Sequence, residues 1–233
     1  MNRFMFNGKY STDYGIYISG EGTYNSPELD VDVVSVPGRN GDLVFSNKRY
    51  KNITVEYPAF IRSEFADNAQ SAKAWLLRPQ KYCRLQDDYH PDEYRLALFE
   101  GPLNFDMQFL NHSGMCTVSF NCKPQRYLVS GEEQFNCTNG GSIYNPTLFD
   151  AEPLILVSGS GAGTLHIGEY TVQILSLSNL ILDCETQNAY YGSTNLNSTI
   201  SADIFPKLTA GNNVISWSGG IQSVKITPRW WTL

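Results

Sequence analysis

Apolar and polar residues alternate in short runs along most of the chain, and a period of two is typical of half-buried β-strands. Residues 53–57 show this alternation, and Pro58 favours the end of that strand or an edge position. Residues 16–18 form another short apolar run, with glycines close to both ends. The clearest alternation covers residues 115–122, whose inward face is predicted to carry Cys116, Val118, Phe120 and Cys122.

A helical period marks residues 63–77, which we predict to form the α-helix of the chain. Ser63 is expected as its N-cap, and Pro79 ends the helix because it pushes Arg78 out of the α region. A single helix among many strands has to bury its apolar stripe on a sheet. The stripe consists of Phe65, Ala69, Ala72 and Leu76, and Trp75 widens it.

Beyond residue 146 the apolar runs are short and strand-like, and no helical spacing recurs. We interpret the glycine-rich stretches 159–163 and 218–220 as hairpin turns between them. About seven short strands without a helix are typical of an antiparallel β-sandwich. The expected strands are residues 154–157, 164–167, 170–175, 180–184, 199–205, 214–217 and 221–226.

These patterns predict a mainly β protein with two domains. Residues 1–135 form a β domain that contains the helix, and residues 136–233 form the sandwich. The boundary is placed in residues 130–146, a stretch rich in glycine, asparagine and glutamate. A chain of 233 residues is long enough for one large β domain or two smaller ones.

The loop of residues 35–43 joins two apolar runs and contains a proline and two glycines. Pro37 fixes φ, and the dipeptide Asn40-Gly41 is favoured in type I′ turns. We therefore predict a hairpin or extended loop that displays Arg39 and Asp42 near its tip. A plain turn also explains this composition, because glycine, proline and asparagine usually mark only a reversal.

This loop reads Ser-Val-Pro-Gly-Arg-Asn-Gly-Asp-Leu, and further short motifs precede and follow it. They are residues 6–9, 14–20, 50–55, 57–61, 74–77, 89–95, 122–126, 145–147 and 226–230. Taken in this order, the motifs resemble the distal tail proteins of phages with long, non-contractile tails. The resemblance covers the chain nearly end to end, and it rests on the order of the motifs rather than on any one of them.

The resemblance implies a hexameric ring that joins the tail tube to the adhesion apparatus and lets DNA pass through its centre. It implies a ring-forming first domain related to tail-tube subunits, and a galectin-like β-sandwich on the outside of the ring. Expected partners are further copies of the chain, the tail tube and tape-measure proteins, a tail-associated lysin or tail-tip fibre protein, and receptor-binding proteins. The expected location is the tail tip of the virion, after assembly in the host cytoplasm.

Within such a ring the tip of the loop is the candidate subunit interface, because Arg39 and Asp42 can bridge neighbouring subunits. The six candidate residues are Pro37, Gly38, Arg39, Asn40, Gly41 and Asp42. The chain lacks the long insertions that carry carbohydrate-binding modules in larger members of that family. The resemblance therefore gives no expectation of glycan binding through such a module.

The charge of the chain narrows the class of partner. Only 17% of the residues are charged, the net charge is −6, and residues 136–233 carry nine of the forty charged side chains. Without a basic stripe, the chain is not expected to grip nucleic acid through phosphate contacts, and an acidic protein does not hold a passing polyanion. No signal peptide or membrane-spanning apolar run is present, so we expect neither general secretion nor a membrane anchor.

No residue pattern is typical of a metal centre, a cofactor site or a catalytic site. The histidines at positions 90, 112 and 166 lie far apart in the sequence and match no catalytic motif. The cysteines show no C-x-x-C spacing, so reduced thiols without zinc or a disulfide are expected. They are Cys83, Cys116, Cys122, Cys137 and Cys184.

Two other functions stay open. A carbohydrate-binding β-sandwich that contacts the host surface could use exposed aromatic pairs such as Tyr190-Tyr191 and Trp230-Trp231. A polysaccharide hydrolase could use two carboxylates of residues 87–93, with Asp92 as the residue to test. Contiguous residues around a proline point in different directions, so a solvated loop or a subunit contact is the preferred interpretation of residues 87–93.

Overall fold

The computed structural model describes residues 2–20, 22, 24–108 and 113–233. Strands dominate, and within these residues α1 (Phe65–Leu77) is the one α-helix, which confirms the predicted fold class. Contacts separate two compact units, residues 1–126 with Leu233 and residues 127–232. We call them the first and the second unit and describe each by itself. The domain boundary inferred from the sequence, after residue 135, stays a proposal.

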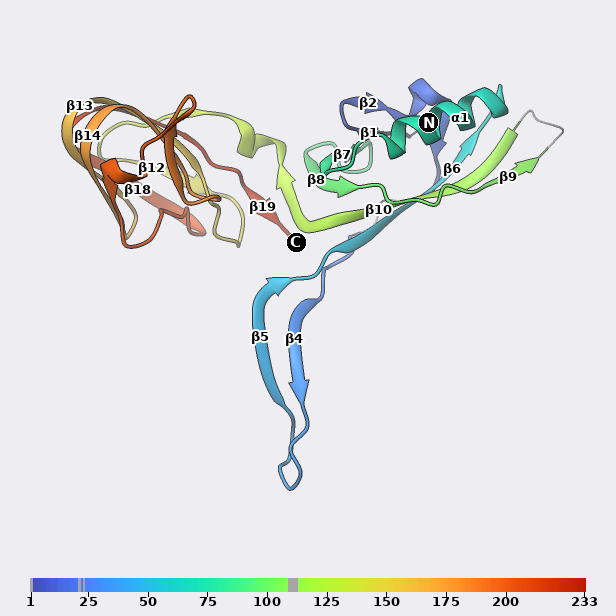
Figure 1. Cartoon of the computed structure of the whole chain (residues 1–233), viewed down its shortest axis with the longest axis horizontal. Coiled ribbons are helices and arrows are strands. Elements are labelled where there is room, and N and C mark those ends of the chain that lie inside the picture. The colour runs from blue at the N-terminus through green and yellow to red at the C-terminus, as the bar shows by residue number, and fades with distance from the viewer. Residues whose placement is uncertain (1, 21, 23, 109–112) are drawn as a thin grey trace. The chain divides into compact units, whose positions relative to one another are not determined.

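The first unit is built on a sheet whose strands follow the order β2-β1-β7-β8-β10-β6-β3, with β9 also paired to β10 (Figure 1). Neighbours in this sheet are often far apart in the sequence, as β1 and β7 are. The strands are β1 (Phe4–Phe6), β2 (Lys9–Tyr10), β3 (Ile16–Ile18), β6 (Ile53–Ile61), β7 (Cys83–Asp87), β8 (Glu93–Leu98), β9 (Phe105–Gln108) and β10 (Ser113–Leu128).

The alternation predicted for residues 115–122 is present in β10, which lies antiparallel to β6. Val118, Phe120 and Cys122 are fully buried, as expected from their shared face. Cys116 is only half-buried, near the end of β10 where β9 joins it. The strand is longer than its alternating pattern, because it continues to Leu128.

β6 continues through Pro58 to Ile61, so the expectation that Pro58 ends the strand is wrong. The Ser19 amide donates to the Pro58 carbonyl oxygen at 2.8 Å, on the side of the strand that faces β3. In an antiparallel pair, the backbone nitrogen and the carbonyl oxygen of one residue point to the same side of the strand. The Pro58 nitrogen therefore also points to the side of β3, at a position just beyond the last paired residue of β3. The missing N–H therefore interrupts no bond to β10. The alternative expectation of an edge position is also wrong, because β6 lies between β10 and β3.

The helix α1 buries the predicted stripe, since Phe65, Ala69, Ala72, Trp75 and Leu76 are all buried. Its start differs from the prediction, because the N-cap is Glu64 in the left-handed conformation, with φ of 49°. Ser63 contacts the first turn of the helix through its backbone: its carbonyl oxygen accepts a hydrogen bond from Asn68 Nδ2 at 2.9 Å. Among the described residues, no helix has the length and apolar character needed to cross a membrane.

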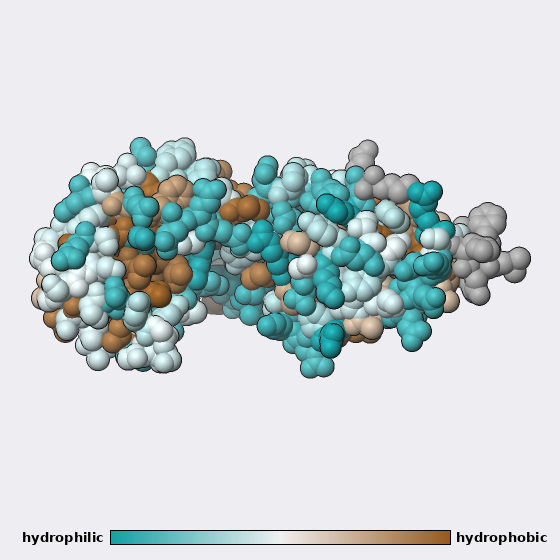
Figure 2. All heavy atoms as spheres, turned by 90° about the horizontal axis from the view of Figure 1, so that it is seen from above, coloured by the Kyte–Doolittle hydropathy of each residue, from teal (hydrophilic) through white to brown (hydrophobic). Residues whose placement is uncertain are grey.

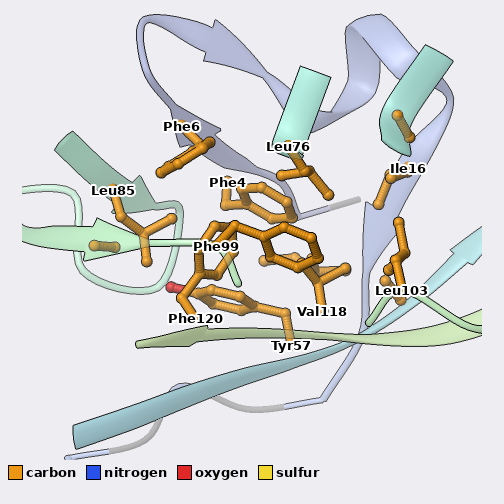
Figure 3. Close-up of a cluster of buried hydrophobic side chains, with 14 of the residues drawn as sticks. Phe4, Phe6, Ile16, Tyr57, Leu76, Leu85, Phe99, Leu103, Val118 and Phe120 are labelled. Atoms are coloured by element: carbon orange, nitrogen blue, oxygen red, sulfur yellow. The ribbon is translucent and has the colours of Figure 1, made fainter. Parts of the chain in front are cut away.

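Aromatic rings fill the core between α1 and the sheet of the first unit (Figure 3). The Phe4 ring centroid lies 5.3 Å from that of Tyr57 and 5.4 Å from that of Phe120. Trp75 stacks on Tyr14 with centroids 4.4 Å apart and 8° between the ring planes. Each such pair adds about 0.5–1.5 kcal/mol beyond the burial of its area, so these contacts help to fix α1 on the sheet.

Three long strands carry the sheet of the second unit, and β13 lies between β14 and β18, antiparallel to both (Figure 1). The strand order is β11-β18-β13-β14-β15-β16, with β12 also on β18 and β17 also on β14. The strands are β11 (Phe135–Asn136), β12 (Gly141–Asn145), β13 (Leu154–Ile167), β14 (Tyr170–Asp183), β15 (Asn188–Tyr191), β16 (Thr194–Asn195), β17 (Ile200–Ser201) and β18 (Gly211–Thr227). The short strand β19 (Trp231–Thr232) is not part of this sheet.

The hairpin turns predicted at residues 159–163 and 218–220 are wrong, because both stretches lie inside long strands. Register shifts in this part of β13 mark β-bulges against β14 and β18. A Cβ atom on Gly220 would lie 1.7 Å from the Ser160 carbonyl oxygen, and one on Gly159 would lie 2.1 Å from the Gly220 oxygen. These glycines therefore permit close approach of two backbones in bent strands rather than chain reversal.

Six of the predicted short strands consequently merge in pairs. Residues 154–157 and 164–167 both belong to β13, and the predicted strands further along combine in the same way into β14 and β18. The long strands curl strongly, so one continuous sheet wraps around the core (Figure 1). Its buried side chains include Ile155, Leu165, Val172, Leu182 and Ile226.

The motif Asn145-Pro146-Thr147 has a structural explanation in the second unit. Asn145 is 1% exposed, and its Nδ2 donates to the carbonyl oxygens of Phe149 and Leu208, both at 2.9 Å. Its Oδ1 accepts from the amide and the hydroxyl of Thr147 at 2.9 and 2.8 Å. A buried amide with all these partners pins the loop after β12 to the chain near residue 208.

The buried thiols give a test of this packing. Burial raises the pKa of Cys122 and of Cys184 from 9.0 to about 12. At pH 8 the thiolate fraction of each is then lowered roughly 1,000-fold, and we expect them to react with iodoacetamide far more slowly than in the denatured chain. Because the folded state favours the thiol, their contribution to the unfolding free energy is complete below pH 9 and declines as the pH rises above it.

Peptide mass mapping after short labelling measures these rates, and denatured protein, in which all five cysteines react alike, is the control. Rapid labelling of Cys122 or Cys184 in the folded protein would contradict the packing of the core around them.

Candidate functional site

The predicted loop of residues 35–43 is the tip of a long hairpin in the first unit. Its strands are β4 (Leu29–Val34) and β5 (Leu43–Tyr50), which form a two-stranded sheet by themselves. They extend away from the main sheet of the unit (Figure 1). None of their residues belongs to the buried cores of the described chain, so the hairpin contributes little to the stability of the fold.

The reversal at the tip uses a different turn from the one predicted. The Arg39 amide donates to the Val36 carbonyl oxygen at 3.2 Å, with Pro37 and Gly38 as the central residues. Gly38 has φ of 79°, as the third position of a type II turn requires. A type I′ turn at Asn40-Gly41 is wrong, because Gly41 has positive φ and Asn40 does not.

Apolar side chains lie on both faces of the hairpin stem. Val33 opposite Val44 supplies one face, and Val34 opposite Leu43 supplies the other. Val33 is 58% exposed, Val44 63% and Phe45 57%, although these residues favour a packed sheet. A single hairpin is marginally stable in water, and exposed apolar side chains gathered in this way make the stem a candidate contact surface.

Ion pairs hold the base of the hairpin together. Asp30 binds Arg49, whose hydrogen bond lowers the pKa of the Asp30 carboxyl group. Glu28 lies 3.3 Å from Lys51 Nζ, and the Lys51 amide donates to the Glu28 carbonyl oxygen at 2.9 Å. These pairs are exposed and weak individually, but they keep the strands in register where the hairpin leaves the sheet.

The tip residues singled out from the sequence are exposed, as a displayed loop requires. Arg39 and Asp42 form no ion pair with each other or with any other described residue. Their charged groups are therefore available to a partner. Cβ atoms added at Gly38 and Gly41 would meet no atom of the chain within 4 Å, so the tip is surrounded by open space.

The cluster at residues 87–93 is a turn whose central carboxylate is used inside the chain. Asp87 Oδ1 accepts from the amides of Tyr89 and His90 at 3.0 and 2.9 Å and lies 3.1 Å from His90 Nδ1. Its Oδ2 accepts from the Tyr57 hydroxyl at 2.6 Å. Burial, together with the charge of Asp87, raises the pKa of Tyr57 well above its usual value, so the hydroxyl stays a donor. Asp92 is exposed in the same turn.

The other two histidines do not join this turn as a catalytic group. His166 is exposed on β13, and its Nδ1 lies 3.0 Å from the Thr171 hydroxyl. His112 lies outside the described residues. In the part of the chain that the structure describes, no three His, Cys, Asp or Glu side chains come together as a metal site, and the cysteines are unpaired.

Most of the aromatic side chains considered for sugar binding are buried or packed on other residues of the second unit. Trp230 is 3% exposed, and Trp231 stacks on Phe149 at 4.6 Å and donates from Nε1 to the Asp150 carbonyl oxygen. Tyr190 is half-buried, which leaves Tyr191 as the exposed ring of the four. The visible face of this unit is mostly of intermediate hydropathy, with apolar atoms gathered near its middle (Figure 2).

The sequence revealed the tip of the hairpin but not the exposed stem. A run such as Leu43-Val44-Phe45 is equally typical of a buried strand, and no local pattern separates the two cases. A useful signal was the charge beside the apolar residues. Asp30 and Asp32 alternate with valines in β4, and Lys48 and Arg49 follow the apolar start of β5. Such strands lack a uniformly apolar face for a core.

Neither a scan against protein-family models nor a search of curated protein sequences found a match to this chain. Among solved structures, the chain is similar to the SPP1 Dit protein, which is described as a paradigm of the hub adsorption apparatus in phages that infect Gram-positive bacteria. The identity is 12%, 100% of both chains is covered, and the TM-score is 0.76. The fold of the chain is therefore that of the Dit protein.

Two further similar chains come from structures of the phage P2 baseplate in its activated conformation. The one with strontium is 10% identical, with 97% of this chain and 98% of that chain covered and a TM-score of 0.48. The one with calcium is 9% identical, with 97% of both chains covered and a TM-score of 0.48.

Proposed function

We propose that this chain is a distal tail protein, a structural component of the tail tip of a phage with a long, non-contractile tail. The observation that carries the proposal is its likeness to the Dit fold, which covers the whole length of both chains. The ordered motifs from residue 6 to residue 230 support the same assignment independently of the fold. The role is structural, and catalysis forms no part of it.

In this role six copies close into a ring, and the hairpin of one copy packs on the next. The support is the hairpin itself, whose exposed valines and Phe45 lie on strands that contribute nothing to a core. Burying these side chains against a second copy removes apolar surface from water at both partners. Arg39 and Asp42 then supply charged contacts at the end of the hairpin, where each can meet an opposite charge on the neighbour. Contacts of this head-to-tail kind close into a ring when their rotation allows it.

The ring joins the tail tube and tape-measure proteins on one side to a tail-associated lysin or tail-tip fibre protein and receptor-binding proteins on the other. DNA passes through its centre without sequence-specific contacts, which suits a net charge of −6. Assembly takes place in the host cytoplasm, and the finished ring lies at the tail tip of the virion.

Electron microscopy of assembled tails that carry a labelled copy of this chain tests the proposal. We expect the label at the tail tip and six-fold symmetry of the density that contains it, because identical head-to-tail contacts repeat around one axis. Isolated subunits are an unsuitable sample, since ring closure can depend on the tube proteins. A label elsewhere in the virion would overturn the assignment, and a five-fold or eight-fold ring would overturn the copy number.

A further inference from the structure

A small cavity lies in the first unit between the strands β6, β7 and β8, near the start of the segment that leads to the hairpin. Its volume is about 40 Å³, and Ser19, Tyr57, Asp87, Arg95 and Arg126 are among the residues that line it. One water molecule needs about 10–15 Å³ on this measure, so the cavity has room for roughly three non-hydrogen atoms.

Arg95, on β8, is the buried cation of this cavity. It is 9% exposed, and Nη1 donates to the Pro124 carbonyl oxygen at 3.3 Å. In the part of the chain that the structure describes, the Arg95 guanidinium makes this one hydrogen bond. No described carboxylate lies within ion-pairing distance of it. Burial lowers the pKa of Arg95, which reflects the cost of desolvating its charge. A guanidinium has five N–H donors, so four are left for another acceptor.

The carboxylates around the cavity are already paired with other groups. Asp87 accepts from the Tyr57 hydroxyl and from the turn at His90. Glu93 lies 3.0 Å from Arg126 Nη1 and balances that arginine. Glu56 has an exposed side chain, which accepts from the Ser119 hydroxyl at 3.2 Å. None of them neutralises Arg95.

Arg126 adds a second unsatisfied donor to the same cavity. Its Nη1 binds Glu93 and its Nη2 donates to the Leu233 oxygen at 2.6 Å. Its Nε is buried and has no hydrogen-bond partner in the described chain. A buried donor without an acceptor destabilises the fold, and a buried charge without a counter-ion does so more strongly. The buried Nε of Arg126 and the Arg95 guanidinium, which forms no ion pair in the described chain, lie at one cavity and therefore favour an anionic ligand.

We propose that this cavity binds one small carboxylate anion, with the Arg95 guanidinium as its main ligand. A carboxylate matches the planar fork of arginine with two parallel hydrogen bonds. Formate has three non-hydrogen atoms and fits the volume of the cavity. The anion is either free in solution or the end of an aspartate or glutamate side chain of another protein. This inference is independent of the role in the phage tail.

The test is thermal unfolding of the intact chain in sodium formate against formamide, its neutral counterpart of the same size. Sodium morpholinoethanesulfonate, whose anion is too large for the cavity, keeps the ionic strength constant. We expect formate to raise Tm by roughly 4–7 °C at about twenty times its dissociation constant, and formamide to have no such effect. Equal curves in formate and formamide would overturn the proposal, whatever the variants below show.

Variants then assign the effect to Arg95. Arg95→Lys keeps the charge but loses the fork, and Arg95→Met removes both, so the formate shift should shrink in the first and vanish in the second. Arg78→Met, at an exposed arginine after α1, should keep the full shift. If Arg95→Met does not fold, the lysine variant decides, and an unchanged formate shift in it would contradict the assignment.

A final comparison separates the two sources of the anion. N-acetyl-aspartate amide presents the same carboxylate on a peptide-like group. A shift like that of formate indicates a side chain of another protein, whereas no shift indicates a free ion. Neither result affects the wild-type comparison on which the proposal depends.

Discussion

Replacing Val44 and Phe45 together by lysine should prevent the protein from joining tails while its unfolding free energy changes by no more than about 0.5 kcal/mol. Both side chains are more than half exposed and belong to a hairpin outside the buried cores. Their loss therefore costs the isolated chain little. In an interface the same change buries two ammonium groups without partners, and substitution of central apolar contacts costs about 2 kcal/mol or more per residue.

Complementation of a phage that lacks this protein, followed by counting of complete tails, measures the assembly effect, and urea unfolding measures stability. Leu175→Lys is the matched control, because Leu175 is 60% exposed in the second unit and should assemble normally. Deletion of residues 37–42 should also abolish assembly and leave the fold largely intact. A double lysine variant that folds and completes tails would disprove the role of the hairpin.

Substituting Gly220 by alanine should destabilise the second unit by about 3 kcal/mol, which corresponds to a fall in Tm of roughly 6–12 °C. The new Cβ would lie 1.7 Å from the Ser160 carbonyl oxygen, and the obstructing atom is backbone rather than the end of a flexible side chain. Either β13 or β18 has to move, and this breaks ladder hydrogen bonds beside the bulge. Thermal unfolding followed by circular dichroism measures the shift.

Gly161→Ala, in the glycine-rich stretch 159–163 of the partner strand β13, is the control. Gly161 has φ of 82°, and a Cβ there would meet no atom within 4 Å. Its replacement therefore costs only the backbone strain of a left-handed residue, about 1–2 kcal/mol. Equal losses for Gly161→Ala and Gly220→Ala would show that close approach of the two strands is not what requires glycine at 220.

Local patterns predicted the first unit well. Period-two alternation in residues 115–122 and helical spacing in residues 63–77 are short-range signals, and the side chains that they place inside are buried, except for the half-buried Cys116. The N-cap was harder, because Ser63 and Glu64 both precede the helix and the cap depends on the backbone conformation at Glu64. The hydrogen bond from Asn68 Nδ2 to the Ser63 carbonyl oxygen at this end of the helix is likewise not revealed by spacing alone.

The long strands of the second unit were not predictable from local patterns. A run such as residues 159–163 has the same composition whether it reverses the chain or lets two strands approach closely. The choice is made by the partner stretch at residues 218–220, about 60 positions away in the sequence, which no local rule includes. The same limit applies to Arg95, whose isolation from carboxylates is visible only once the strands are in place.

The two strands of the hairpin differ in charge, and this gives the hairpin a polarity. β4 carries Asp30 and Asp32 with Glu28 before it, whereas β5 carries Lys48 and Arg49 with Lys51 after it. Pairing between two copies of the acidic edge, or between two copies of the basic edge, sets like charges side by side and is disfavoured. In the proposed ring, the contact that we expect is therefore the acidic edge of one copy beside the basic edge of another, which favours directional association over symmetric pairing into closed dimers.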